Sequence, residues 1–120
     1  MLYHDRVTVR LYVYVGVDDR GNDKYEWQVH PNVPATVYPL DADLSMSDNR
    51  ATVITRYRMV LAPTLTIPVM TSEDVRIEWG PYVVDPAVVN SGLFVDGGIE
   101  RHYVRGRLHH YELTTKQVVG

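Results

Sequence analysis

The stretch VTVRLYVYV, residues 7–15, decides the fold class, because apolar and polar side chains alternate along it. Val or Leu stands at every odd position, and Thr, Arg or Tyr stands between them. A period of two sustained over nine residues predicts a β-strand with one face toward a core. The segment GVDDRGNDK, residues 16–24, follows it and is rich in Gly, Asp and Asn, which favour tight reversal. We therefore expect a β-hairpin whose second strand covers residues 25–30.

Further strands and turns are expected outward from this hairpin. Pro31 and Pro34 lack a backbone N–H, so residues 30–33 should not lie in a central strand, and a short edge strand is expected at 35–38. Period two returns at 50–61, 75–79, 82–84 and 99–113, with reversals predicted at Gly80-Pro81 and at the Asp-Gly-Gly within 93–98. Single helical turns are the most that residues 71–74 and 86–90 can form.

Short strands separated by turn signals roughly every 8 to 15 residues indicate an all-β fold. At 120 residues the chain has the size of one domain, and a small barrel closes its sheet edges most economically. The expected fold is a small antiparallel β-barrel of six to seven strands with at most one short helical turn. It forms a single domain over residues 1–120 with a long loop at about 40–49. The inward positions predicted to form the core are Val7, Val9, Leu11, Val13, Val53, Tyr57, Met59, Val75, Ile77, Trp79, Val104 and Leu108.

Composition narrows the function classes. The formal charge of −3 argues against a protein that binds mainly the nucleic-acid backbone. No cysteine is present, which excludes disulfides and thiolate metal clusters, and no apolar run is long enough to span a bilayer. Ten of the twelve basic residues are Arg and nine residues are Tyr, a bias typical of interface cores. We expect that the protein is made in a cytoplasm and that it functions by binding to other macromolecules.

No catalytic residue, metal ligand or cofactor is predicted. The five histidines show no HExxH-type spacing, and His102 and His110 on one extended strand would lie more than about 25 Å apart. The acidic residues 41–48 lack the later Gly and Glu of a calcium-binding loop, so solvated loop acids are the simpler interpretation. No P-loop, GxGxxG or GxSxG occurs.

Two segments are candidate interaction sites instead. Residues 40–49 (LDADLSMSDN) form the acidic loop, with candidate residues Leu40, Asp41, Asp43, Leu44, Ser45, Met46, Ser47 and Asp48. The second segment is a basic and aromatic stripe expected on one face of the last strand, formed by Arg101, Tyr103, Arg105, Arg107 and His109. The stripe is either a contact surface for an acidic partner or DNA, or an ordinary solvated sheet face.

An ordered set of segments resembles the head-to-tail stopper (head-completion) proteins of siphophages, in particular those of actinobacteriophages. These segments are MLYHDRVTV, the DRGND hairpin with Trp27 after it, VPATVYP, RATVITRYRMVL, TSEDVRIEW and HYVRGRLHH. They cover most of the chain, whereas residues 86–98 do not match the pattern.

The resemblance implies a virion structural protein of the phage neck without enzymatic activity. Such a protein forms a homo-oligomeric ring that closes the DNA exit channel, joins the portal or adaptor ring to the tail terminator or tail tube, and lets packaged DNA pass through its lumen. By similarity, residues 40–49 project into that lumen. The alternatives are another neck ring such as a tail terminator, or an OB-like nucleic-acid-binding β-barrel.

Overall fold

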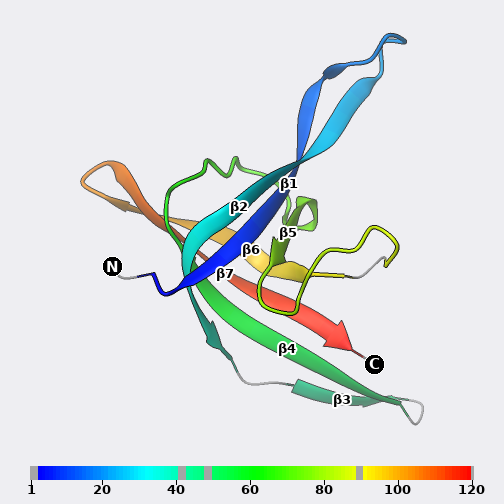
Figure 1. Ribbon diagram of the computed structural model, residues 1–120, viewed down its shortest axis with the longest axis vertical. Helices are drawn as coiled ribbons and strands as arrows, with labels where there is room; N and C mark the ends of the chain where they lie inside the picture. The colour runs from blue at the N-terminus through cyan, green and yellow to red at the C-terminus, as the bar shows by residue number, and fades with distance from the viewer. Residues whose placement is uncertain (1–2, 41–42, 48–49, 89–90, 120) are drawn as a thin grey trace.

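The computed structural model describes residues 3–40, 43–47, 50–88 and 91–119, with side chains described over 3–40, 55–88 and 91–117. Within these residues the chain forms seven strands and one 3₁₀ turn (Figure 1). In chain order they are β1 Asp5–Val17, β2 Asp23–Pro39, β3 Asp43–Ser47, β4 Arg50–Leu61, η1 Ser72–Asp74, β5 Val75–Glu78, β6 Leu93–Val104 and β7 Arg107–Val119.

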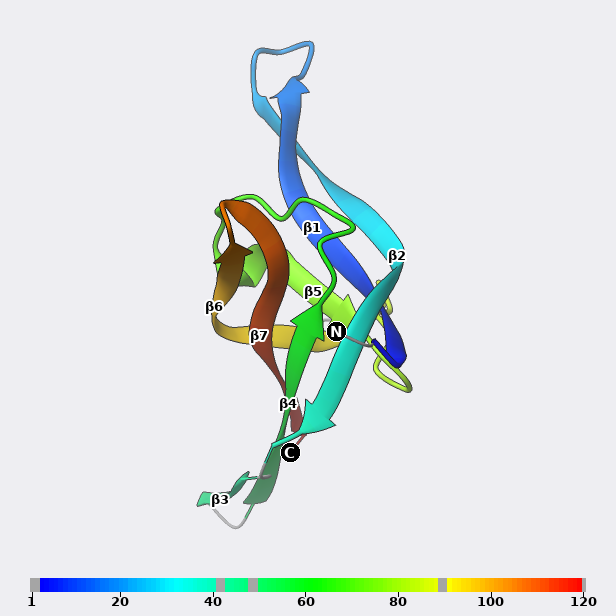
Figure 2. The same ribbon diagram turned by 90° about the vertical axis from the view of Figure 1, so that its left-hand side faces the viewer.

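The described strands pair antiparallel in the order β2-β1-β5-β6-β7-β4-β3, and a further pairing of β2 with β4 closes six of them into a barrel. The closing ladder runs from Ala35 opposite Leu61 to Pro39 opposite Tyr57. The prediction of a small antiparallel β-barrel is therefore confirmed. The Cα radius of gyration is 16.0 Å, against about 14 Å for a compact domain of this length. The excess reflects hairpins that project from the barrel, as Figure 2 shows for β1–β2.

The β1–β2 hairpin is confirmed, and its tip is held by Asp18. The Asp18 carboxylate accepts hydrogen bonds from the backbone N–H groups of Arg20 (2.8 Å) and Asn22 (2.9 Å). The short edge strand predicted at 35–38 is wrong, since β2 continues through both prolines. Asn32 adopts a positive φ of 57° at a bulge opposite β1, and in the described chain β2 pairs with β4 only from Ala35 onward. Pro31 thus lies in the bulge, and Pro34 lies just before the ladder with β4, where its carbonyl accepts from the Ala62 N–H at 2.9 Å and no N–H is needed in return.

The core lies inside the barrel and largely follows the predicted positions. Six of these residues are buried, namely Val7, Val9, Leu11, Met59, Val75 and Ile77. Four are partly buried and pack against them, namely Val13, Tyr57, Trp79 and Leu108. The prediction that Val104 belongs to the core is wrong, because this residue is 51% exposed at the end of β6. The side chain of Val53 lies outside the described residues.

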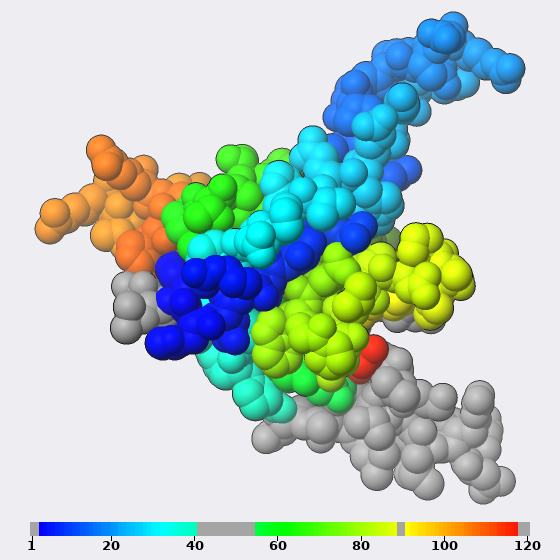
Figure 3. Space-filling view, viewed as in Figure 1, coloured from blue at the N-terminus to red at the C-terminus, as the bar shows by residue number. Residues whose placement is uncertain are grey.

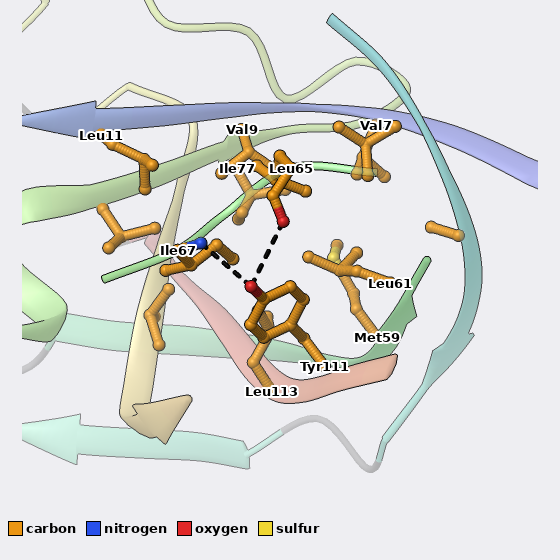
Figure 4. Close-up of a cluster of buried hydrophobic side chains, with 14 of the residues drawn as sticks. Val7, Val9, Leu11, Met59, Leu61, Leu65, Ile67, Ile77, Tyr111 and Leu113 are labelled. Carbon is orange, nitrogen blue, oxygen red and sulfur yellow. Dashed lines mark hydrogen bonds between the residues drawn. The ribbon is translucent and has the colours of Figure 1, made fainter. Parts of the chain in front are cut away.

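A segment without regular structure between β4 and η1 also enters the core. Leu65 and Ile67 are buried, and the hydroxyl of Tyr111 on β7 fixes both (Figure 4). That hydroxyl donates to the Leu65 carbonyl (3.2 Å) and accepts from the Ile67 N–H (3.0 Å). The buried tyrosine therefore ties this segment to the barrel interior.

The reversal at the C-terminal end of the sheet was predicted in the wrong place. Asp96-Gly97-Gly98 is a bulge inside β6, where Gly97 has φ 84°, and β6 continues to Val104. The chain turns at Arg105 (φ 52°) and Gly106 (φ 77°). Positive φ at both central residues is the signature of the tight type I′ turn that matches strand twist. Residues 99–113 are therefore a hairpin and not one strand.

The acidic loop and the helical turns also differ from expectation. Asp43–Ser47 form β3, which pairs with β4 from Asp43 opposite Ile54 to Ser47 opposite Arg50. The alternation of apolar and small polar residues over 43–47 has the strand period, and this outweighed the acidic composition. The turn at 71–74 is present as η1, whereas Pro86 and Ala87 form a simple turn, with residues 89–90 outside the described chain. The return strand predicted at 82–84 is limited to a bridge between Trp79 and Tyr82.

Candidate functional site

The predicted basic stripe divides between two strands and the turn that joins them. Arg101 and Tyr103 lie on β6, Arg105 in the turn, and Arg107 and His109 on β7. The Arg101 guanidinium donates to the Ile67 carbonyl at 2.8 Å, so this residue supports the core segment. The other four are exposed on the hairpin that projects at the left of Figure 3 in orange. The prediction that the five residues share one face of one strand is therefore wrong. Instead, the four exposed residues lie at the end of the β6–β7 hairpin, and we call them the basic β6–β7 tip.

The same hairpin brings together histidines that the sequence argument separated. His102 lies opposite His110 in the β6–β7 ladder, and Glu100 lies opposite Glu112 two residues along. The two imidazole rings stack with centroids 4.5 Å apart and planes at 11°. The predicted separation of more than about 25 Å between His102 and His110 is wrong, because it assumed one extended strand where the chain turns back. We call these four residues, Glu100, His102, His110 and Glu112, the His–Glu cluster.

Close polar contacts connect the His–Glu cluster internally. The Oε2 atom of Glu112 lies 2.9 Å from Nε2 of His110 and 3.0 Å from Nε2 of His102. Nε2 of His102 also lies 3.1 Å from Oε1 of Glu100. Both imidazoles therefore point their Nε2 atoms at carboxylate oxygens, and those of His102 and His110 converge on one of them.

Arg58 on β4 holds the two carboxylates from the side. Its guanidinium donates to Glu100 at 2.8 Å and to Oε1 of Glu112 at 3.3 Å. The hydrogen bond from Arg58, followed by that from His102, lowers the pKa of Glu100 below its ordinary value. The hydrogen bond with His110, followed by that from Arg58, lowers the pKa of Glu112 despite partial burial. Both glutamates are therefore held in the charged form.

A bulge in β7 places a further histidine beside the cluster. The register shifts between His102 and Tyr103, which leaves His109 without a residue opposite it in the described ladder. Its Nδ1 atom lies 2.8 Å from Nδ1 of His110. Because a neutral imidazole carries one proton, one of these nitrogens donates and the other accepts.

An aromatic surface covers one side of the projecting β1–β2 hairpin and was not predicted as a site. Tyr12 lies opposite Trp27 and Tyr14 opposite Tyr25, with ring centroids 5.1 Å and 5.7 Å apart. Tyr14, Tyr25 and Trp27 are each about half exposed. We call these four residues the aromatic arm patch. The signal was available in the sequence, since Tyr12 and Tyr14 occupy the polar-face positions of the first strand.

The residues around the aromatic arm patch carry no excess of positive charge. Over residues 10–29 the sequence has three basic residues (Arg10, Arg20, Lys24) and four acidic ones (Asp18, Asp19, Asp23, Glu26). Exposed Tyr and Trp in a near-neutral setting are typical of protein interfaces, whereas strands that bind nucleic acid combine aromatics with a basic groove.

The acidic loop candidates are only partly described. Leu40 is exposed, and its N–H donates to the Arg56 carbonyl at 2.9 Å. Asp43, Leu44, Ser45, Met46 and Ser47 belong to β3, which lies outside the closed barrel as an extension on β4 (Figure 1). Asp41 and Asp48 lie outside the described residues.

Hollows in the described surface adjoin β2. One of about 350 Å³ is lined by residues 29–34 with Thr64 and Leu65. It includes His30, whose Nε2 is buried without a hydrogen-bond partner among the described residues. Another of about 190 Å³ lies between Arg10, Trp27, Arg76, Val84 and Pro86. No described segment forms a helix with the length and apolarity that a bilayer crossing needs.

Comparison with known proteins gives a similarity of fold. The sequence matches no family profile and no curated protein. Among solved structures, the fold is similar to a chain of the virion of a native gene transfer agent (GTA) particle, with a TM-score of 0.58 and 13% sequence identity. The alignment covers 99% of this chain and 97% of that chain. The two chains therefore share the whole barrel fold, and few residues of either chain lie outside the alignment.

Proposed function

We propose that this protein is a virion structural protein of a tailed phage and that it acts as a head-to-tail stopper. In this function it forms a ring in the neck, closes the DNA exit channel and joins the portal or adaptor ring to the tail terminator or tail tube. It acts through contacts with other virion proteins and needs no enzymatic activity or cofactor.

The observation that carries the proposal is the full-length similarity of fold to a chain of a gene transfer agent virion. The match extends over 99% of this chain and 97% of the other, so the similarity is not confined to a short shared motif. The ordered sequence segments that resemble stopper proteins support the more specific role in the neck.

The shape of the molecule suits a ring subunit. A closed barrel supplies a rigid body, and its hairpins extend beyond it in different directions (Figures 1 and 2). A ring joins two unlike surfaces of each subunit head to tail. The aromatic arm patch and the basic β6–β7 tip offer such unlike surfaces, and the acidic residues 41–48 offer the tip a partner of opposite charge.

The residues predicted to project into the ring lumen lie mainly on the β3–β4 hairpin. In the proposed ring this hairpin points toward the channel, and its acidic residues repel packaged DNA while the channel is shut. Because β3 pairs with β4 outside the six closed strands, its displacement leaves the barrel ladders in place. A gate built on such an extension opens without unfolding the domain.

A genetic experiment tests the function directly. In a phage that carries this coding sequence, an amber mutation should give DNA-filled or leaking heads and free tails, and expression of the protein from a plasmid should restore joined particles. Electron microscopy of the lysate distinguishes these outcomes. Fully joined virions in the absence of the protein would refute the proposal.

A matched pair of variants tests the aromatic arm patch. Trp27→Ala should reduce complementation of the amber mutant, because it removes the largest exposed aromatic group of the patch. Val69→Ala changes a side chain that is 91% exposed elsewhere on the surface, and it should complement fully. Equal complementation by the two variants would exclude the patch from virion contacts.

An OB-like nucleic-acid-binding barrel is the second candidate, and the exposed rings of the aromatic arm patch favour it. Fluorescence anisotropy with labelled single-stranded DNA separates the two functions. A stopper should show no tight, strongly salt-dependent binding, since the net charge is −3. Tight binding that falls steeply with salt and is lost in Trp27→Ala would favour the nucleic-acid protein.

A further inference from the structure

We propose that the His–Glu cluster binds a divalent transition-metal ion of the Zn²⁺ class through Nε2 of His102, Nε2 of His110 and Oε2 of Glu112. These ligand atoms come from neighbouring strands of one hairpin and all lie within 4.8 Å of one another. The site does not depend on the proposed function, because it follows from the β6–β7 register alone.

The spacing of the ligand atoms is close to what zinc requires. Bonds of 2.0 to 2.1 Å in a tetrahedral arrangement place neighbouring ligand atoms roughly 3.3 Å apart. The distances from Oε2 of Glu112 to the two Nε2 atoms, 2.9 Å and 3.0 Å, are already within a few tenths of an ångström of that value. The rings of His102 and His110 are stacked with planes at 11°, so they must rotate out of the stack before both Nε2 lone pairs point at one ion. The partial exposure of both side chains leaves room for this rotation.

The donor set selects the class of metal. Two imidazole nitrogens and one carboxylate oxygen suit Zn²⁺ and its neighbours in the transition series, whereas Ca²⁺ and Mg²⁺ prefer oxygen alone. Three protein ligands leave a fourth tetrahedral position, and the partial exposure of His102 and Glu112 opens it to water.

Surrounding groups already orient the ligands. Arg58 holds Oε1 of Glu112 at 3.3 Å and so turns Oε2 toward the imidazoles. In the metal-bound form the Nδ1–H of His110 donates to Nδ1 of His109, which lies 2.8 Å away, so that the lone pair of His110 is on Nε2, the atom that faces Glu112. A metal-binding histidine commonly donates its second ring N–H to an acceptor in this way, which fixes the tautomer and the ring orientation.

The charges that face the site are compatible with a cation. Glu112 and Glu100 contribute two negative charges, and Arg58 balances one of them. In the metal-free protein the Nε2–H groups of the imidazoles donate to the carboxylates. When the metal binds the Nε2 lone pairs, the single proton of each neutral imidazole moves to Nδ1, so the site accepts the ion without a net change in bound protons.

Calorimetric titration of the tag-free, full-length protein with Zn²⁺ tests the proposal. The expected result is saturable binding of one ion per chain. Co²⁺ should compete with Zn²⁺ and give the visible absorption of a tetrahedral site. His102→Ala and Glu112→Gln should each weaken binding at least about tenfold, the loss that even supporting residues of metal sites produce.

His4→Ala is the matched control, because His4 is exposed and lies outside the cluster. It should bind Zn²⁺ like the wild-type protein. Circular dichroism confirms that each variant is folded, and the near-isosteric Glu112→Gln covers the case in which His102→Ala does not fold. Absence of saturable binding to the wild-type protein, or equal binding by Glu112→Gln and wild type, would overturn the proposal.

Discussion

Replacement of Tyr111 by phenylalanine isolates the hydrogen bonds that hold residues 65–67 inside the barrel. The ring stays in place, and only the hydroxyl that joins the Leu65 carbonyl (3.2 Å) and the Ile67 N–H (3.0 Å) is lost. Tyr111, Leu65 and Ile67 are all buried, so water cannot substitute for it. An unpaired buried donor or acceptor costs about 1 to 3 kcal/mol, so the two unpaired groups together give a loss of roughly 2 to 6 kcal/mol.

Urea unfolding followed by circular dichroism measures this loss as a lower midpoint at unchanged slope. Tyr103→Phe is the control, because Tyr103 is 61% exposed and removal of its hydroxyl should change the free energy of unfolding by no more than about 0.5 kcal/mol. If the two variants unfolded at the same urea concentration, Tyr111 would not anchor the segment, and the account of how it enters the core would be refuted.

Further predictions concern backbone strain and pH. Gly92→Ala should lower the free energy of unfolding by at least about 1 kcal/mol in urea titrations, because Gly92 has φ 77° and a Cβ there would lie 2.8 Å from a methyl group of Val84; an unchanged midpoint would contradict this. In acid, the urea concentration at the midpoint of unfolding should fall as the pH drops below about 4.5. The reason is that the lowered pKa values of the two glutamates in the His–Glu cluster make the unfolded state bind more protons than the folded state. Substitution of both glutamates by glutamine should reduce this slope, and an unaltered slope would place the effect elsewhere. In alkali the stability should change with pH in the opposite sense and fall as the pH rises, since the hydrogen bond with Tyr82 and burial raise the pKa of Tyr57 to about 12. Stability should therefore fall between about pH 10 and 12, and Tyr57→Phe should make this fall shallower.

The sequence predicted the fold wherever one local signal dominated. The alternation over residues 7–15 and the Asp and Gly residues after it were sufficient for the β1–β2 hairpin. The prolines of β2 were misleading, because their cost depends on whether the strand edge beside them is paired, and that is a tertiary property. The strand pattern in Asp43–Ser47 was present in the sequence, but acidic composition concealed it.

The candidate site depended on the position of one turn. Asp-Gly-Gly is the stronger turn signal by residue type, whereas the chain reverses at Arg105-Gly106 and uses Gly97 for a bulge. Period two continues on both sides of either position, so alternation alone cannot locate the turn. An error of about eight residues in the turn separated His102 from His110, which are cross-strand neighbours.

The order in which the barrel closes has a consequence during synthesis of the chain. The β1–β2 ladder needs only residues 5–39, whereas the ladder between β4 and β7 needs residues 107–119, the last of the described strands. Until these residues are made, one long edge of β4 has no partner strand, and its N–H and C=O groups are open to another nascent chain. Translational pausing or truncation before residue 107 should therefore yield insoluble protein, and a β7 peptide added in trans should restore solubility.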